Sequence, residues 1–462
     1  MIVQKFGGTS VADPDAVLRL IDIVRRAQAS ACASTRTPRG PVLVVSALSG
    51  VTDALLAIAA DAGTGLTEQA LAHVEHLRER HAAMVRALVA PDERAATLAR
   101  VNGQFDELTA VVRALVVLRE VSPRTLDVIA AMGELLSSAI VAAALRREGL
   151  AGEWVDARRA IVTNDDYTRA APLMRETRAA LRAVVLPLVD AGRVPVMGGF
   201  VGATASGHTT TLGRGGSDFS GAIVGAAIDA GEIQIWTDVD GMLTADPRLI
   251  PGAQLVPKLS FEEAAELAYF GAKVLHPSTI HPAVERNISV RILNSRKPEG
   301  SGTLIVAEPS MDGTPLTAMA AKRDVTVIDI TSSRMLMAYG YLRRVFEVFE
   351  RYRTAVDVVT TSEVSVSVTV DDRRHLDAIV EALSEFAGVS VESEMALLCA
   401  VGDRLQADPG IGARVVRVLE EVPLRMISQA ASRRNITVIM RQADLPHAMH
   451  RLHEEFFPCP SR

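Results

Sequence analysis

Apolar and polar residues follow two different patterns along the chain, and the change of pattern divides it into two parts. In the first part, apolar stripes with helical spacing alternate with short unbroken apolar runs. Residues 14–29 predict a helix, because four apolar side chains fall on one face: Val17, Leu20, Ile21 and Val24. Asp13 is the expected N-cap of this helix and Pro14 its first residue. The run Val42–Val45 predicts a strand that is buried on both faces.

Further elements of both kinds follow in alternation. Helices are predicted over residues 67–120, from Pro123 onward, over 173–190 and over 223–230, and strands at 154–156, 161–163, 194–197, 233–236 and 288–293. This alternation predicts an α/β domain with a mainly parallel sheet covered by helices. In such sheets, ligands bind beyond the carboxyl ends of the strands. The hydroxyl-rich turn at residues 46–52 follows a predicted strand and is expected at that edge.

Beyond residue 315 the pattern changes to alternation with a period of two residues. Valines alternate with polar residues over 364–370, which predicts a half-buried antiparallel strand. The order strand, helix, two strands, helix occurs twice, over 325–386 and over 395–456, with the strands of the first unit at 325–330, 356–359 and 364–370. This repetition predicts an internal duplication of a ferredoxin-like fold. Residues 308–315 are rich in Pro, Gly and Ser and are predicted to form a linker.

Composition narrows the class of protein. The chain has 462 residues, of which 48% are hydrophobic and 23% charged, and a net charge of −6. We expect a globular protein of two to four domains with no affinity for nucleic acid or an anionic membrane surface. No secretory signal and no uninterrupted apolar run of membrane-spanning length are seen. Cys32, Cys399 and Cys459 form no CxxC pair, so neither a disulfide framework nor a zinc site is expected, and the cytoplasm is the expected compartment.

The N-terminal segment Lys5-Phe6-Gly7-Gly8-Thr9-Ser10 joins a predicted strand to a predicted helix through two glycines. Such a turn directs backbone N–H groups and a helix dipole at one point, which favours an anion, and Lys5 adds a full positive charge. A phosphate group is the expected ligand. A tight turn beside a surface lysine is the simpler alternative, and the spacing of a Walker A loop is absent.

A second glycine-rich segment, Gly213-Arg214-Gly215-Gly216-Ser217-Asp218, precedes the helix predicted over 223–230. The guanidinium of Arg214 can bind a carboxylate or a phosphate through two parallel hydrogen bonds. A flexible loop would explain the glycines but not the charged pair among them. The strand at 233–236 then ends in Thr237-Asp238, which could line a nucleotide pocket or form an acidic surface turn.

Two other polar features are less informative. Glu134 has apolar neighbours on both sides in the sequence, and from these alone an exposed position is the simplest interpretation. His276 and His281 lack acidic or cysteine partners at metal-ligand spacing, so we interpret them as structural residues.

Taken together, these motifs resemble those of aspartate kinases, and the final one of the set is Phe270-Gly271-Ala272-Lys273-Val274-Leu275-His276-Pro277. The resemblance covers nearly the whole chain. It implies an amino-acid kinase domain over residues 1–307 and two ACT regulatory domains over 316–390 and 391–462. It also implies that ATP, with Mg²⁺, phosphorylates the side-chain carboxylate of L-aspartate. This reaction is the first step towards lysine and diaminopimelate, threonine and methionine.

The resemblance also implies roles for individual residues. Lys5 and Asp218 would be catalytic, and the aspartate would be bound by Thr52, Glu134, Arg214 and Ser217. ATP would be bound by Lys5, Gly7, Gly8, Thr237, Asp238, Leu243, Arg248, Lys273 and Val274. No metal-ligating protein residue is implied. Because an aspartate carboxylate has a pKa near 3.9 and is already ionised at neutral pH, the reaction needs no general base.

In the first ACT unit, six residues match positions that bind lysine in the lysine-inhibited type: Met335, Val356, Asp357, Thr361, Ser362 and Glu363. Three residues depart from that type. Leu243 replaces a tyrosine near the nucleotide, and Ala338 and Ala355 replace serines. The resemblance therefore implies an amino-acid effector without fixing its identity. It also implies a homodimer formed through the ACT domains.

Two alternatives remain at this point. One is a kinase of the same fold that acts on another carboxylate, such as an N-acetylglutamate kinase, although the paired ACT units argue against it. The other is a catalytically silent amino-acid sensor that keeps only its ACT pair, against which the intact Lys5, Glu134, Arg214 and Asp218 argue.

Overall fold

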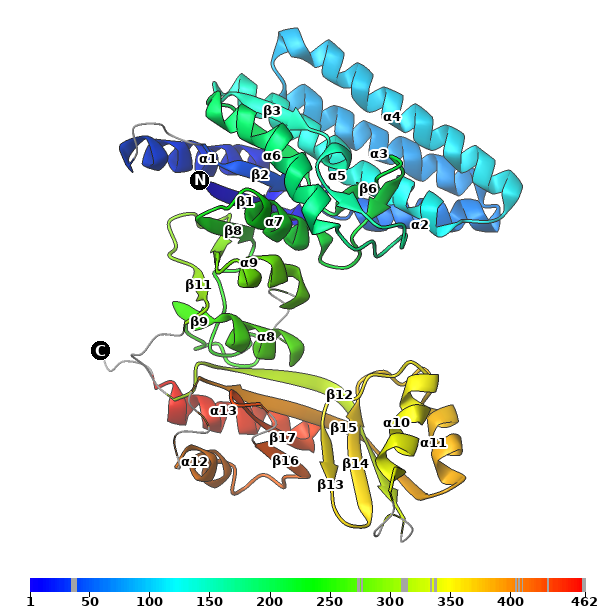
Figure 1. Cartoon of the computed structure of the whole chain (residues 1–462), viewed down its shortest axis with the longest axis vertical. Coiled ribbons are helices and arrows are strands. Elements are labelled where there is room, and N and C mark those ends of the chain that lie inside the picture. Colours follow the sequence, from blue (N-terminus) through cyan, green and yellow to red (C-terminus); the bar gives the residue numbers. More distant parts are fainter. Residues whose placement is uncertain are drawn as a thin grey trace. The chain divides into compact units, whose positions relative to one another are not determined.

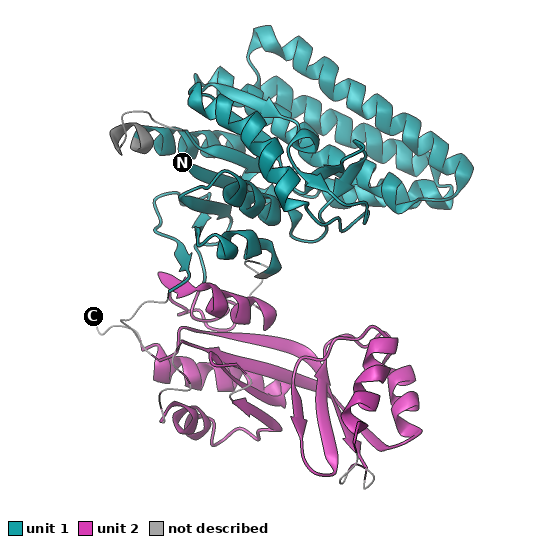
Figure 2. Ribbon diagram, viewed as in Figure 1, with its two compact units in different colours: residues 1–242, 274–308 teal, residues 243–273, 309–462 magenta. Residues whose placement is uncertain are grey.

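The computed structural model describes residues 1–34, 40–271, 275, 277–308, 315–332, 335, 339–403, 405, 408, 410–429 and 432–458. These residues form two compact units (Figures 1 and 2). The first unit contains residues 1–242 and 274–308, and the second contains residues 243–273 and 309–462. Residues 243–273 thus interrupt the first unit in sequence, so the chain passes from the first unit to the second and back before entering the second again.

A mainly parallel sheet forms the centre of the first unit. Its strands in spatial order are β3 (Gly152–Val155), β5 (Val194–Gly198), β2 (Val42–Val45), β1 (Ile2–Phe6), β8 (Glu232–Thr237), β10 (Ser289–Asn294) and β11 (Thr303–Val306). Each neighbouring pair is parallel except β10 and β11. The α/β prediction is confirmed, because parallel strands need helical crossovers between them.

Helices cover both faces of this sheet (Figure 1). The first unit contains α1 (Pro14–Ser34), α2 (Val51–Thr64), α3 (Thr67–Leu88), α4 (Pro91–Leu118), α5 (Pro123–Arg147), α6 (Met174–Asp190), α7 (Gly216–Ala227) and α9 (His281–Glu285). The helices α1 to α5 share one hydrophobic core with β1, β2 and β5, and α6 and α7 pack against the sheet from the other side. The N-cap oxygen expected at Asp13 is in place, since it accepts from Ala16 N, and Ser122 likewise accepts from Thr125 N at the start of α5.

Helix α5 is long and apolar enough to cross a membrane by length and composition, which the interrupted apolar pattern did not suggest. In the folded chain, however, 94% of its most apolar window is buried. We therefore interpret α5 as the central helix of a packed core, where an all-round apolar surface is expected.

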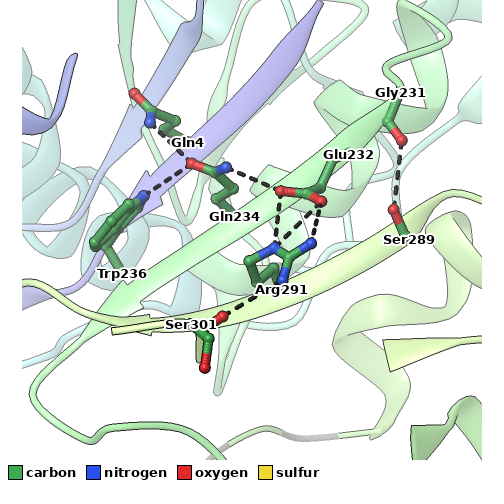
Figure 3. Close-up of polar contacts among 8 residues, drawn as sticks. All are labelled: Gln4, Gly231, Glu232, Gln234, Trp236, Ser289, Arg291 and Ser301. Atoms are coloured by element: carbon green, nitrogen blue, oxygen red, sulfur yellow. Dashed lines mark hydrogen bonds and ion pairs between the residues drawn. The ribbon is translucent and has the colours of Figure 1, made fainter. Parts of the chain in front are cut away.

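A chain of polar contacts crosses three strands of the sheet (Figure 3). Gln234 on β8 accepts from the side chains of Gln4 on β1 and Trp236, and donates to Glu232. Glu232 in turn binds the guanidinium of Arg291 on β10. Residues 232, 234 and 236 lie on one face of β8 because side chains alternate along a strand. The contacts hold β1, β8 and β10 in register, so that Lys5 and Thr237 come to the same edge.

A small sheet lies beside the main one and was not predicted in full. It consists of β4 (Val162–Thr163), β6 (Val201–Thr204) and β7 (Thr209–Thr211), in that order. No strand is predicted at residues 209–211, but these three residues pair with β6. The helix after β7 also begins earlier than predicted, at Gly216 rather than near residue 223, so Ser217 and Asp218 lie in its first turn.

The second unit contains one antiparallel six-stranded sheet with the order β13 (Val359–Thr361), β14 (Ser365–Val370), β12 (Ala318–Thr331), β15 (Gly388–Val401), β17 (Asn435–Arg441) and β16 (Met426–Gln429). Its helices are α8 (Phe261–Tyr269), α10 (Tyr341–Arg351), α11 (Leu376–Ser384), α12 (Ile411–Val418) and α13 (Leu445–Phe456), and it also holds the short strand β9 (Lys258–Ser260). Ser260 and Glu263 form a capping box that opens α8.

The strands β12 and β15 are each 14 residues long and belong to both halves of this sheet. One end of β12 pairs with β14, and both of its ends pair with β15. The helices α10 and α11 cover one half, and α12 and α13 cover the other, each pair over its own hydrophobic core. The strand predicted at 325–330 is therefore only part of β12, and residue 395, where the second predicted repeat begins, lies within β15. The strand expected at 356–359 is instead observed at Val359–Thr361.

Candidate active site

A cavity of about 750 Å³ lies at the carboxyl edge of the first unit's sheet. This volume suits a bound small molecule or cofactor. Ten of the residues proposed from the sequence line it together: Lys5, Gly7, Gly8, Thr52, Glu134, Arg214, Ser217, Asp218, Thr237 and Asp238. They come from segments that are far apart in the sequence. The turn at 46–52, expected at this edge, also lines the cavity.

Lys5 and Asp218 form an ion pair within the cavity wall, with Nζ of Lys5 2.6 Å from Oδ1 of Asp218. Lys5 is the fourth residue of β1, and Asp218 lies in the first turn of α7. The helix can approach the strand closely because residue 221 is glycine, where an added Cβ would lie 3.2 Å from Cβ of Lys5. The pair fixes a buried ammonium group beside the N-terminus of a helix, which is a favourable place for a phosphate.

The glycine turn after β1 lies beside the ammonium group of Lys5 in the wall of the cavity. Gly7 N donates to Trp236 O at 3.0 Å, and the short 3₁₀ helix Gly8–Val11 follows. A Cβ on Gly7 would lie 3.5 Å from Nζ of Lys5, and one on Gly8 would lie 3.2 Å from Ala47 O. Glycine at both positions therefore leaves room for a ligand to approach the backbone beside the ammonium group.

Glu134 faces the same cavity from α5 and is 3% exposed, so the exposed position suggested by its sequence neighbours is wrong. Burial raises the pKa of its carboxyl group to about 8, although a hydrogen bond from the Ala47 backbone and the charge of Lys5 oppose the rise. Its Oε2 accepts no hydrogen bond from the residues that the structure describes. A buried acceptor without a partner is costly, and it favours binding of a cationic donor.

Arg214 lies in the loop between β7 and α7, where Gly213 and Gly215 have φ of +76° and +72°. These left-handed conformations are readily adopted by glycine and allow the tight loop. Arg214 is exposed at the cavity, and Ser217 follows it in the first turn of α7. The cavity thus presents a cation at Arg214 and a carboxyl group at Glu134. These two groups could bind the α-carboxylate and the α-ammonium of an amino acid.

The remaining proposed nucleotide residues are placed less completely. Thr237 and Asp238 follow the carboxyl end of β8 and line the cavity. Leu243 and Arg248 belong to the second unit, where the exposed guanidinium of Arg248 binds Asp246. Lys273 and Val274 lie outside the described residues, as does His276.

The six proposed regulatory residues belong to the second unit. Met335 and Val356 pack against the core beneath α10 and α11, while Thr361, Ser362 and Glu363 are exposed. The side chain of Asp357 is almost completely buried, and its Oδ1 lies 2.8 Å from Nζ of Lys322. Ala355 is exposed, and Ala338 lies outside the described residues.

Sequence reasoning missed several residues that line the cavity, among them Asp127 and Phe200. Phe200 has φ of +65°, which is unusual for a bulky residue and is held by a hydrogen bond from its N–H to Ser220. The two glycines before it were the available signal. Asp127 lies two helical turns before Glu134 on α5, a spacing that could have linked the two.

No group of three His, Cys, Asp or Glu side chains could hold a metal ion in the part of the chain that the structure describes. His281, interpreted as structural, is exposed and lies 3.5 Å from Glu285 one helical turn away.

Comparison with known proteins agrees with this geometry. The amino acid kinase family model matches residues 1–294, and an ACT domain model matches residues 398–456. Aspartokinase 3 of Arabidopsis thaliana, named as chloroplastic, is 36% identical over 98% of this chain and 81% of its own length. The lysine-sensitive aspartokinase 3 of Escherichia coli is 34% identical over 99% of both. The chain therefore belongs to the aspartokinases within the amino acid kinase family.

Solved structures give the same result. Aspartokinase III of Escherichia coli in complex with aspartate and ADP is 34% identical, covers 99% of this chain and all of its own, and superposes with a TM-score of 0.81. The same enzyme in complex with lysine and aspartate has a TM-score of 0.82. The fold expected from the sequence, an amino-acid kinase domain followed by ACT domains, is confirmed.

Proposed function

We propose that this chain is an aspartate kinase, which transfers the γ-phosphoryl group of ATP to the side-chain carboxylate of L-aspartate and forms 4-phospho-L-aspartate and ADP. The observation that carries the proposal is that three groups line one cavity: the ammonium group of Lys5, which suits a phosphate, the guanidinium of Arg214, which suits a carboxylate, and the buried carboxyl group of Glu134, which suits an ammonium group. The aspartokinase relatives support the same substrate.

The chemistry needs binding and charge rather than proton transfer. The attacking carboxylate is ionised at neutral pH, so catalysis depends on in-line positioning and on stabilising the charge of the transferred group. Lys5 would stabilise that charge, and Asp218 would hold the ammonium group of Lys5 in place. Gly7 and Gly8 would surround the phosphate oxygens. Arg214 and Glu134 would bind the two ends of the amino acid, with Thr52 and Ser217 beside them.

The proposed nucleotide residues are Thr237, Asp238, Leu243, Arg248, Lys273 and Val274. Mg²⁺ would be carried by the ATP phosphates and water, as in most phosphoryl-transfer sites, with Ser217 and Asp218 beside it. When bound there, Mg²⁺ neutralises charge on the phosphate oxygens. This fits a cavity that has acidic side chains at Asp218 and Asp238 but no cluster of acids able to hold an ion by itself among the described residues.

We also propose that the second unit binds an amino-acid effector through Met335, Val356, Asp357, Thr361, Ser362 and Glu363. The aspartokinase III of Escherichia coli has been solved with lysine. In this chain, the Asp357 carboxylate already has the Lys322 ammonium as a partner. Any effector that binds Asp357 must therefore share or displace an internal cation.

The proposal also covers the domain boundaries, the association of two copies, the cellular compartment and the biosynthetic routes that the product would supply. The domains would be residues 1–307, 316–390 and 391–462, and two copies would associate through the ACT domains. Tyr339, Leu342 and Phe346 are exposed apolar residues on or beside α10 and are suited to such contacts. The enzyme would act in the cytoplasm and supply the lysine, diaminopimelate, threonine and methionine routes.

The direct test traps the product. The purified chain is incubated with ATP, Mg²⁺, L-aspartate and hydroxylamine, which converts an acyl phosphate into a coloured hydroxamate. We expect hydroxamate formation with aspartate and none with N-acetylglutamate. Activity only with N-acetylglutamate would identify a kinase for that substrate, and activity with neither would favour a sensor without catalysis.

A further inference from the structure

Asp127 is the most extensively bonded carboxylate in the wall of the cavity. It lies in the first half of α5, is 1% exposed, and accepts hydrogen bonds with both oxygens. Thr168 N donates to Oδ1 at 3.0 Å and to Oδ2 at 2.9 Å. Thr211 donates its N–H to Oδ2 at 3.1 Å and its hydroxyl to Oδ1 at 2.5 Å. One buried anion thus binds two separate backbone segments to the helix.

The first of these segments is held in an uncommon conformation. Thr168 has φ of +72°, which is unfavourable for a residue with a branched side chain. Its carbonyl oxygen then lies so near Gly213 that an added Cβ there would be 3.2 Å away. Asp127 therefore supports Thr168, and Thr168 in turn lies against the loop that carries Arg214.

The second segment leads directly to the same loop. Thr211 ends β7, and Arg214 follows three residues later. The backbone at Thr211 is also bound by Ala170 N, at 2.8 Å. Between Thr211 and the start of α7, the loop is closed by a hydrogen bond from Gly216 N to Gly213 O. The backbone immediately before Arg214 is thus set by two segments, at Thr168 and Thr211, that both bind Asp127.

The same helix carries Glu134. Asp127 and Glu134 are seven residues apart, which places them on one face of α5 with a rise of about 10 Å between them. Glu134 would bind the ammonium group of the amino acid, and Arg214 would bind its carboxylate. A single rigid helix therefore determines the separation of the two groups that would bind the two ends of the substrate.

Resting on the function proposed above, we propose that Asp127 is a positioning residue for the amino-acid substrate, which fixes Arg214 relative to Glu134 through Thr168 and Thr211. Both carboxylate oxygens are engaged by the protein, so Asp127 acts through these residues and not by contact with the substrate. Phosphate binding is provided by different segments, at Lys5 and at the Gly7–Gly8 turn, and should not depend on it.

The test measures both Michaelis constants in the hydroxamate assay for Asp127→Asn and for the matched control Asp156→Asn. Asp156 also accepts backbone and guanidinium hydrogen bonds, from Arg158, but it does not line the cavity. We expect Asp127→Asn to raise the aspartate KM roughly ten- to hundredfold. The ATP KM should change less than twofold, and the control should leave both constants unchanged.

A double variant separates positioning from general damage. In an Arg214→Lys background, Asp127→Asn should raise the aspartate KM much less than it does alone, because the two residues act on the same contact. If Asp127→Asn does not fold, Thr211→Val is used instead, because it removes only the hydroxyl contact to Asp127. This variant should also raise the aspartate KM more than the ATP KM. Equal rises in both Michaelis constants, or fully multiplicative effects in the double variant, would overturn the proposal.

Failure of the proposed function gives a different result. If the wild type forms no hydroxamate, the chain is not an aspartate kinase. The role of Asp127 is then measured by calorimetric titration of the protein with L-aspartate. Weaker binding by Asp127→Asn than by Asp156→Asn would then support the positioning role. Equal binding by the two variants would reject it.

Discussion

The ammonium group of Lys5 lies 2.6 Å from the carboxylate of Asp218, although the two residues are 213 positions apart in the sequence. The pair joins the central strand β1 to the first turn of α7. It holds a positive charge at the point where the glycine turn would bind phosphate. Because this charge is fixed before the substrate arrives, it can stabilise a transition state without reorganisation.

Replacement of Lys5 tests that role. Lys5→Ala should lower kcat roughly 10²- to 10³-fold, the usual cost of removing one preorganised charge or donor. The protein should stay folded, although its thermal midpoint should fall because Asp218 loses its partner. Lys258→Ala, which removes an exposed lysine, is the matched control. Near-normal turnover by Lys5→Ala would exclude Lys5 from the mechanism.

The raised pKa of Glu134 predicts that aspartate binding depends on pH. Its carboxyl group has a pKa of about 8 and is mainly neutral at pH 7, whereas an ammonium ligand requires the carboxylate. The aspartate KM should therefore fall as pH rises from 6 towards 8, by up to tenfold per pH unit. Steady-state kinetics across this range would measure the effect. A flat profile would show that Glu134 does not receive the ammonium group.

The raised pKa of Glu134 also predicts that the stability of the fold depends on pH. A carboxyl group whose pKa is raised on folding contributes full stability below its unfolded pKa of 4.5, and this contribution is lost as pH rises through about 8. At pH 8.5, the free energy of unfolding of Glu134→Gln, measured by urea titration, should therefore exceed that of the wild type by roughly 3–5 kcal/mol. At pH 5 the difference should be much smaller. Glu120→Gln, at an exposed position, should show no such difference.

Arg214→Lys tests which substrate the guanidinium binds. Lysine retains the charge but not the pair of parallel donors, so the aspartate KM should rise while the ATP KM stays nearly constant. The hydroxamate assay with each substrate varied in turn gives both constants. A rise confined to the ATP KM would assign Arg214 to the nucleotide instead.

Free lysine should inhibit this enzyme weakly or not at all. Ala338 and Ala355 offer no hydroxyl donors to an effector carboxylate, and losing two hydrogen bonds to a charged group weakens binding by about two to four orders of magnitude. Inhibition curves for lysine, threonine and methionine would be compared between the wild type and Ala338→Ser/Ala355→Ser. Strong inhibition of the wild type by sub-millimolar lysine would contradict this expectation.

Much of the fold was predictable because its signals are local. The apolar run Val42–Val45, the cap Asp13 and the valine alternation at 364–370 each reflect the period or a terminus of one element. The small strand Thr209–Thr211 was missed because three threonines among glycines carry no periodic pattern, and its pairing with β6 is a tertiary contact.

The candidate site was predictable where motifs mark it and not where packing forms it. Lys5 and Arg214 stand in glycine-rich turns that reveal themselves in the sequence. The burial of Glu134 depends on how closely α5 approaches the turn at Ala47, where a Cβ on Gly133 would lie 2.7 Å from that of Ala47. The partners of Asp127 are 41 and 84 residues away, so its spacing from Glu134 on α5 is the one local signal it carries.

The two long strands β12 and β15 have a practical consequence for dissecting the protein. Residues 390 and 391, where the two ACT domains were expected to meet, lie within β15. A fragment that ends at 390 would lack the segment of β15 that pairs with β17, and the N-terminal end of β12 would lose its neighbour. Its sheet would then expose unpaired edges, which promote aggregation. The smallest separable regulatory piece is the pair of halves together, so any signal received by one half reaches a strand that the other half also contains.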